Sequence, residues 1–198
     1  DPALAKEKSW GLEAFLRGEA GGFAFSLGAF ASWFDNYIYE ADTGLEEDEL
    51  PVFQYAQGDA TYYGFEAEFS APLFDAGNFR IVADGVADYV RAKIDAVGPA
   101  PRIPPLRLLG GIEAQSDLLT GRVEVEWSDK QTRVAAFGSH TLVNASVSWR
   151  VLGADGPATL RLSANNIFDV DARRHASFTK DYVPLAGRDV RGTLSLSF

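Results

Sequence analysis

Hydrophobic and polar residues alternate along most of this chain, from about residue 10 onward. In residues 62–73, for example, Phe65 and Phe69 share one parity, whereas Glu66 and Glu68 occupy the other. A two-residue period places unlike side chains on opposite faces of a β-strand. The pattern therefore predicts strands whose two faces meet different solvents.

The alternation recurs in about nine segments, many of them about ten residues long. They are residues 10–16, 23–33, 62–73, 79–89, 106–115, 123–128, 143–151, 158–165 and 189–198. A tilted strand that crosses a membrane needs roughly 9 to 11 residues, whereas strands of soluble domains are typically shorter. We therefore predict an all-β protein that forms an antiparallel transmembrane β-barrel wall.

The predicted connections between these strands alternate between short and long. The short ones contain glycine and fall at residues 18–22, 75–78, 119–121 and 153–156, and the long ones at residues 40–60, 93–104, 130–140 and 169–187. Outer-membrane barrels have tight periplasmic turns at one rim and long extracellular loops at the other. The alternation thus favours a barrel over a sandwich, in which loop lengths are commonly mixed at both ends.

Aromatic residues gather near the long-loop ends of the predicted strands. They are Trp33, Tyr37, Tyr39, Tyr62, Tyr63, Tyr89 and Trp127. Aromatic side chains are enriched at both membrane–water interfaces of barrels. We therefore expect them to form an interfacial girdle.

Composition narrows the function classes. The net charge of −10 argues against nucleic acid as a partner, because phosphate contacts need basic clusters. The sequence has none of the motifs that mark a catalytic nucleophile, a phosphate-binding glycine loop or a metal-binding helix, so we do not expect an enzyme. The chain lacks Met and Cys and starts at Asp1, and we expect a processed or excised piece of a longer protein.

Four short motifs, in their order along the chain, carry a resemblance to a known family. They are FDNYIY at residues 34–39, GFEAE at 64–68, NIFD at 166–169 and PLAGR at 184–188, followed by a closing strand that ends on Phe198. In these motifs the chain resembles the C-terminal part of a TonB-dependent receptor, over nearly its whole length. Such receptors import scarce nutrients through the outer membrane of Gram-negative bacteria.

The resemblance implies that residues 1–198 are the C-terminal part of a barrel domain of about 22 strands. The plug domain that fills such a barrel is absent from this sequence. The implied partners are the TonB energy-coupling complex, which acts through the missing plug, outer-membrane lipid, and the barrel assembly machinery at Phe198. No resident cofactor is implied. A soluble β-sandwich binding module and an ungated porin are the alternatives.

Two segments are similar to receptors assigned to zinc uptake. They are RHASFTKDYVP at residues 174–184 and PRIPPLR at residues 101–107. The prolines of the second segment also have a simpler explanation, because closely spaced prolines hold a loop extended. The resemblance points to zinc as transported cargo, while siderophores, haem, cobalamin and oligosaccharides stay open.

The only two histidines, His140 and His175, fall in predicted long loops. Neutral imidazole is a common zinc ligand, so exposed histidines near Lys180 and Asp181 are candidate ligand-binding residues, with His140 and His175 as the metal ligands. Loop histidines are more often simply solvated. The acidic residues 46–49 have a similar simple explanation as a solvated loop tip.

The polar parity of the strands carries charges of both signs. They are Glu66, Glu68, Arg80, Asp84, Asp88, Arg107, Glu113, Glu124, Glu126, Arg150 and Arg161. A water-facing wall needs such polar groups and cross-strand ion pairs. Arg80, Arg107 and Arg161 are the best candidates for contacts with a plug or with solute in the lumen, because a guanidinium holds carboxylates bidentately.

Overall fold

The computed structural model describes residues 3–133 and 137–197, which form one antiparallel sheet. Its strands are β1 (Lys8–Ala20), β2 (Phe23–Glu47), β3 (Leu50–Ala76), β4 (Phe79–Ile94), β5 (Gly98–Pro99), β6 (Arg107–Gln115), β7 (Leu119–Ser128), β8 (His140–Arg150), β9 (Ala158–Asn165) and β10 (Asp189–Leu196). Each long strand pairs with its neighbour in sequence, and β5 adds two residues beside β4. The predicted all-β antiparallel architecture is confirmed.

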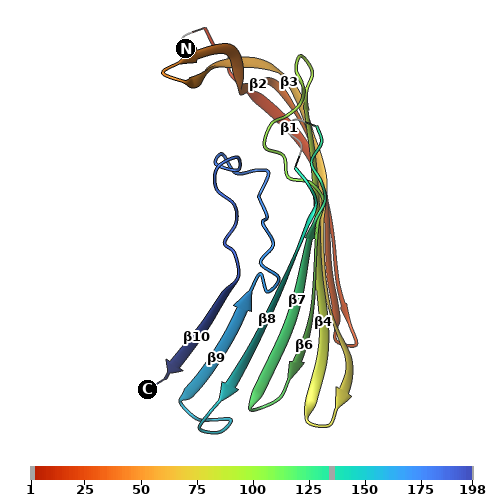
Figure 1. The fold of residues 1–198 in the computed structure, drawn as a ribbon. Coiled ribbons are helices and arrows are strands. Elements are labelled where there is room, and N and C mark those ends of the chain that lie inside the picture. Colours follow the sequence, from red (N-terminus) through yellow and green to blue (C-terminus); the bar gives the residue numbers. More distant parts are fainter. Residues whose placement is uncertain (1–2, 134–136, 198) are drawn as a thin grey trace.

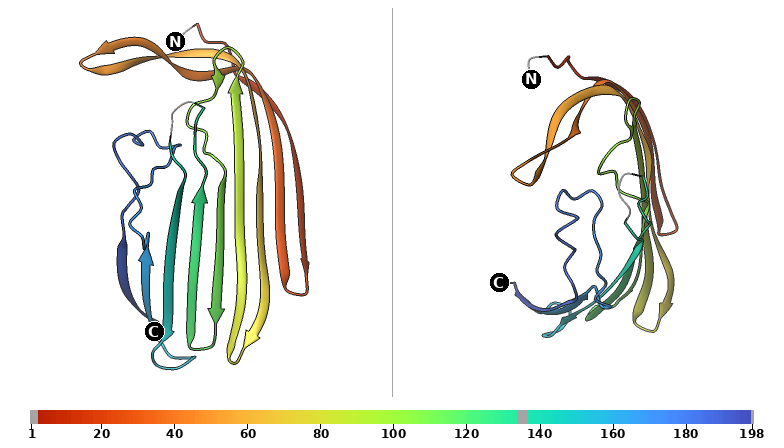
Figure 2. Two further views of the ribbon diagram at one scale, coloured as in Figure 1. Left: turned by 45° about the vertical axis from the view of Figure 1, so that its right-hand side comes forward. Right: turned by 45° about the horizontal axis from the view of Figure 1, so that its top comes forward.

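The sheet is a curved wall that stays open (Figure 1). β1 and β10 are its two edges, and they do not pair with each other. Figure 2 shows the long connection between β9 and β10 lying inside the curve of the wall. The described residues contain no helix that is long and apolar enough to span a bilayer.

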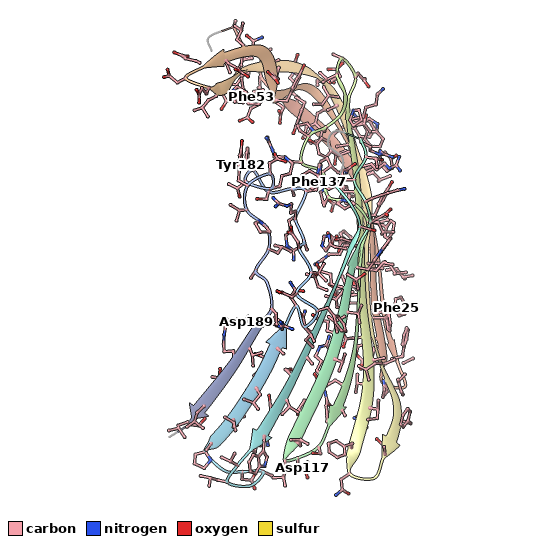
Figure 3. All side chains as sticks on the ribbon, viewed as in Figure 1. Phe25, Phe53, Asp117, Phe137, Tyr182 and Asp189 are labelled. Carbon is pink, nitrogen blue, oxygen red and sulfur yellow. The ribbon has the colours of Figure 1, made fainter. Side chains whose placement is uncertain are left out.

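The two faces of the wall differ as the alternation predicts. Phe25 points to the convex side (Figure 3), and its cross-strand neighbour Phe69 is 46% exposed. The concave side carries the ionic side chains described below. Only six hydrophobic residues are buried among those described, so the apolar convex face has no second sheet packed on it. The sandwich alternative is therefore wrong.

Three of the four predicted long connections are confirmed, between β4 and β6, between β7 and β8, and between β9 and β10, but the first predicted long loop is wrong and one short turn is displaced. Residues 40–60, expected as a long loop, are mostly strand, because β2 and β3 continue as one long hairpin that turns at Asp48 and Glu49. The predicted alternation of short and long connections therefore fails at this hairpin. The β2–β3 register shifts between Phe34 and Tyr37 and between Asp42 and Glu46. The turn predicted at residues 119–121 lies three residues earlier, where Ser116 Oγ accepts a hydrogen bond from Leu119 N at 3.0 Å. The acidic residues 46–49 form the exposed hairpin tip, as the simpler explanation held.

The predicted aromatic girdle is divided between the two faces. Trp33 stacks on Trp10 of β1, with ring centroids 4.1 Å apart, on the convex side. Tyr37, Tyr39 and Tyr62 instead pack around buried residues such as Ile94 on the concave side. These three tyrosines were expected in the lipid-facing girdle, and that prediction is wrong. Tyr62 has the parity of Glu66 and so faces the concave side, and the register shift in β2 brings Tyr37 to the same face as Tyr62. The hydroxyl groups of Tyr37 and Tyr62 are hydrogen bonded at 2.6 Å.

Candidate functional site

Ion pairs cross the concave face from strand to strand. Arg107 of β6 donates from Nε to Asp88 Oδ2 of β4 at 2.7 Å, and its Nη1 lies 3.6 Å from Glu126 Oε2 of β7. Glu126 is one of the few buried charged residues, at 8% exposure. The predicted polar residue Arg107 therefore holds two carboxylates of the wall itself.

A second cluster, lower on the same face, centres on Arg122. Its guanidinium donates to Asp84 Oδ2 at 2.8 Å and to Glu124 Oε2 at 3.0 Å, and it lies 4.0 Å from Glu113 Oε2. Sequence reasoning missed Arg122, because it started this strand at residue 123. The residue has the parity of Glu124, so the alternation could have found it.

The other two arginines predicted for lumen contacts lie apart from these clusters. Arg80 is mostly exposed near the short-turn rim, with Nε 3.9 Å from Asp75 Oδ1. Arg161 donates from Nη2 to Ser146 Oγ at 3.1 Å and is also exposed. Contacts of Arg80, Arg107 and Arg161 with a plug stay a prediction.

A pocket of about 350 Å³ lies at the long-loop end of the concave face. Its lining comes from the interior of β4, from the ends of β6, β7 and β8 and from the connections that lead to β6, β8 and β10. It includes Asp88, Arg107, Gln131, Phe137, His140, Arg173, Arg174 and His175. Both histidines of the chain thus meet in one pocket, although 35 positions separate them in sequence.

His175 is 4% exposed, contrary to the predicted solvent-exposed loop histidine. Its ring packs edge-on against Phe137, with centroids 5.6 Å apart, and within the described residues neither ring nitrogen has a hydrogen-bond partner. Burial, and secondarily the charge of Lys180, lowers its pKa below the ordinary value. The imidazole is therefore neutral at neutral pH, the state in which it can bind a metal ion.

The remaining predicted ligand-binding residues surround this pocket without forming a complete metal site. His140 is the first residue of β8 rather than part of a loop, and it is half-buried. Lys180 Nζ and Asp181 Oδ2 lie 4.0 Å apart, and neither lines the pocket. In residues 3–133 and 137–197, no three His, Asp, Glu or Cys side chains converge as a metal site requires. Metal binding by His140 and His175 stays a prediction.

The connection 166–188 is fixed at its two ends by residues of the NIFD motif. Asn166 is 4% exposed, and its backbone N–H donates to Asn144 Oδ1 at 2.9 Å. Its side-chain Nδ2 donates to the carbonyl oxygens of Val170 and Ala186, at 2.9 and 3.2 Å. Asp169 Oδ1 accepts from the backbone N–H of Arg188 at 2.7 Å. These bonds join the start of the connection to its end.

Two further contacts hold the connection 166–188 against other parts of the rim. Arg174 Nη2 lies 3.5 Å from Glu126 Oε1 of the wall. The guanidinium of Arg102 stacks over the ring of Phe178 at 4.0 Å and also donates from Nη1 and Nη2 to Glu40 Oε2, both at 3.2 Å. Arg102 therefore joins the β2–β3 hairpin to the connection that carries His175. Sequence reasoning missed both arginines as rim contacts, since nothing in their spacing marks a partner so distant along the chain.

Residues 1–167 match the family described as TonB dependent receptor-like, beta-barrel. This chain belongs to the TonB-dependent receptor family. The resemblance read from the four short motifs is thereby confirmed at the level of the family.

Solved structures show the same fold at low sequence identity. The copper transporter OprC superposes with a TM-score of 0.84 at 19% identity, covering 100% of this chain and 32% of OprC. A mutant of the ferric enterobactin receptor PfeA from Pseudomonas aeruginosa gives 0.69 at 19% identity, covering 97% and 31%. The FrpB iron transporter from Neisseria meningitidis gives 0.71 at 13% identity, covering 99% and 31%. The chain thus spans about a third of the length of these transporters.

Proposed function

We propose that this chain is the C-terminal part of the barrel wall of a TonB-dependent receptor, which imports a scarce nutrient across the outer membrane of a Gram-negative bacterium. The observation that carries the proposal is the family match over residues 1–167. The uncovered apolar face opposite an ionic face also supports it, because a barrel in lipid needs this division.

Additional strands and a plug complete the receptor in this proposal. The edges β1 and β10 do not pair with each other, and a sheet in hydrocarbon cannot leave backbone N–H and C=O groups unpaired. The plug occupies the concave side and couples to TonB. The barrel assembly machinery recognises the closing strand at Phe198, a residue that lies outside those the structure describes.

Uptake by the full-length receptor in cells with and without TonB tests this function. Uptake of the nutrient above the rate of passive diffusion is expected to vanish without TonB, because the gate needs energy coupling. The same uptake rate in both strains would favour the ungated porin instead. Transport proteins are not enzymes, and we propose no catalytic residue.

For the cargo we propose a transition-metal ion such as zinc, contacted at the rim pocket by His140 and His175. The supporting observation is that both imidazoles line one pocket and that the nitrogens of His175 have no partner among the described residues. Two imidazoles alone are an incomplete coordination sphere for zinc, so this cargo requires ligands from elsewhere in the receptor.

Calorimetric titration of the full-length receptor with Zn²⁺, Cu²⁺, haem and a ferric siderophore separates the cargo classes. Tight binding of one metal ion that is lost in His175→Ala supports the metal ion as cargo. Asn165→Ala, an exposed substitution outside this pocket, is the control. Unchanged metal affinity in His175→Ala, or tight binding of haem or siderophore only, would overturn it.

A further inference from the structure

Four cationic side chains gather near the long-loop rim, where β4 extends beyond its partner β6. Arg91 and Lys93 belong to β4, and Lys130 and Arg133 follow β7. β4 continues past the last residue that pairs with β6, which is Asp88. Residues 99–106 and 129–133 therefore lie beside this part of β4, where a hollow of about 180 Å³ is lined by Arg91, Lys130 and Arg133.

The register places the β4 members of this basic patch on the convex face. Tyr89 lies opposite Phe65, and Arg91 lies opposite Tyr63. Phe65 and Tyr63 are 41% and 47% exposed on the apolar side. Arg91 also stacks over the ring of Tyr89 at 5.4 Å. Because side chains two residues apart in a strand share a face, Lys93 follows on the same side.

The charges of the patch are only partly compensated within the described residues. Lys93 Nζ is 3.2 Å from Asp95 Oδ1. Asp129 also lines the hollow, but its Oδ1 accepts from the backbone N–H of Lys130. The side chains of Lys130 and Arg133 are exposed, without an ion pair among the residues described. Four cations thus face two carboxylates in a chain whose net charge is −10.

The patch lies at the upper border of the apolar convex surface. Toward the short turns this surface presents exposed side chains such as Phe69, Ile112 and Val123. Tyr63, Tyr89 and Trp127 lie at its upper end, and aromatic rings of this kind mark the level of lipid headgroups. Figure 3 shows nitrogen-bearing side chains on the convex side in the upper half of the wall. In an outer membrane, the phosphates of the outer leaflet would lie at the level of Arg91 and Lys93, and Arg91 shares its hollow with Lys130 and Arg133.

We propose that Arg91, Lys93, Lys130 and Arg133 bind the phosphate groups of a phosphorylated lipid in the outer leaflet. A guanidinium pairs with phosphate through two parallel hydrogen bonds, while ammonium groups add point charges. The inference rests on the proposed function, since the barrel in an outer membrane sets the level of the patch. This phosphate binding would be a contact with a particular class of lipid, in addition to the contact of the apolar convex face with the hydrocarbon of any lipid.

Native mass spectrometry of the full-length receptor in detergent tests the inference, with bisphosphorylated lipid A as the probe and monophosphoryl lipid A for comparison. The double substitution Arg91→Gln/Arg133→Gln should weaken retention of the bisphosphorylated form by roughly fivefold for each cation removed. Arg17→Gln/Arg191→Gln removes the same charge from the concave face, where Arg17 lies opposite Ser26 and Arg191 opposite Ser163, and should leave retention unchanged.

Equal retention by wild type and the Arg91/Arg133 variant would overturn the inference, as would equal affinity of wild type for the two lipid A forms. Displacement of the lipid by inorganic phosphate would make the patch a general anion site and would also overturn it. Failure of the full-length receptor to insert into outer membranes would instead refute the proposed function. Normal insertion with no loss of lipid in the variant would refute the lipid site alone.

Discussion

The part of the sheet toward the short turns, called the lower wall below, differs from the long-loop rim in what fixes the position of each side chain. In the lower wall, neighbours in sequence alternate between faces, so that Leu162 is on the convex side and Ser163 on the concave side of β9. At the rim, His175 owes its burial to Phe137, and its neighbour Arg174 is held by Glu126. Local backbone geometry thus specifies the wall, whereas side-chain contacts between distant residues specify the rim.

The largest effect is expected from placing a charge on the convex face of the lower wall. Leu162→Arg should destabilise the full-length receptor by about 2–4 kcal/mol in a bilayer, because the guanidinium would face hydrocarbon. Ser163→Arg places the same side chain one residue along β9, on the concave face, and should cost less than about 1 kcal/mol. Urea unfolding from lipid vesicles measures both. Equal costs would show that the two faces meet the same solvent.

Removal of a cation from the concave face should have the next largest effect. Arg122→Gln leaves Asp84, Glu113 and Glu124 close together without their shared cation. We expect a loss of about 1–3 kcal/mol, less than for a fully buried pair because these side chains are about a quarter exposed. Arg161→Gln, which loses one hydrogen bond to Ser146, is the control and should cost less than about 1 kcal/mol. Urea unfolding from lipid vesicles measures both variants, and equal losses for Arg122→Gln and Arg161→Gln would contradict a stabilising role of the Arg122 cluster.

At the rim, the corresponding substitution is Asn166→Ala. It removes the bonds from Nδ2 to Val170 and Ala186, and the acceptor Oδ1 for the N–H of Val170. The loss should be about 1–2 kcal/mol but confined to one connection, seen as faster amide hydrogen exchange in residues 169–187. Asn165→Ala, next to it and exposed, removes only the single bond from Nδ2 to Asp189 Oδ1 and is the control, with a smaller change in exchange expected. Faster exchange throughout β7 and β8 would contradict a local role.

Acidification should give the smallest effect, again at the rim. Because burial holds the pKa of His175 below its ordinary value of 6.5, the folded rim favours the neutral ring. Its contribution to stability is fully present above pH 6.5 and decreases as the pH falls through the folded-state pKa. Hydrogen exchange in residues 169–187 should therefore accelerate at acidic pH in the wild type. His175→Phe should flatten this response, and an unchanged response would assign it to another group.

The same contrast explains which features could be predicted from sequence. Phe65 and Glu66 lie on the expected faces, because the two-residue period of a strand determines the face of each side chain. The turn between β6 and β7 was misplaced, since the hydrogen bonds of Ser116 override the glycine at position 121. Residues 40–60 were expected as a loop because register shifts interrupt the alternation without ending the strands.

Features of the site depended even more on tertiary structure. The charge ladder with Arg107, Asp88 and Glu126 follows from parity and could be anticipated in outline. Two other features depend on how the long connections fold back over the rim. One is that His140 and His175 line the same pocket. The other is that Arg102 contacts both Glu40 and Phe178. No periodicity encodes that folding.

The two unpaired edge strands of the sheet have a consequence for heterologous production. The β1 margin shows Trp10, Leu12 and Phe15, at 64%, 68% and 75% exposure, beside a row of vacant backbone donors and acceptors. Expressed without the rest of its receptor, the polypeptide would offer an edge on which strands of other copies can pair, and we expect it to accumulate in inclusion bodies. Coexpression of the complementary strands on a second polypeptide would give that margin its natural neighbour.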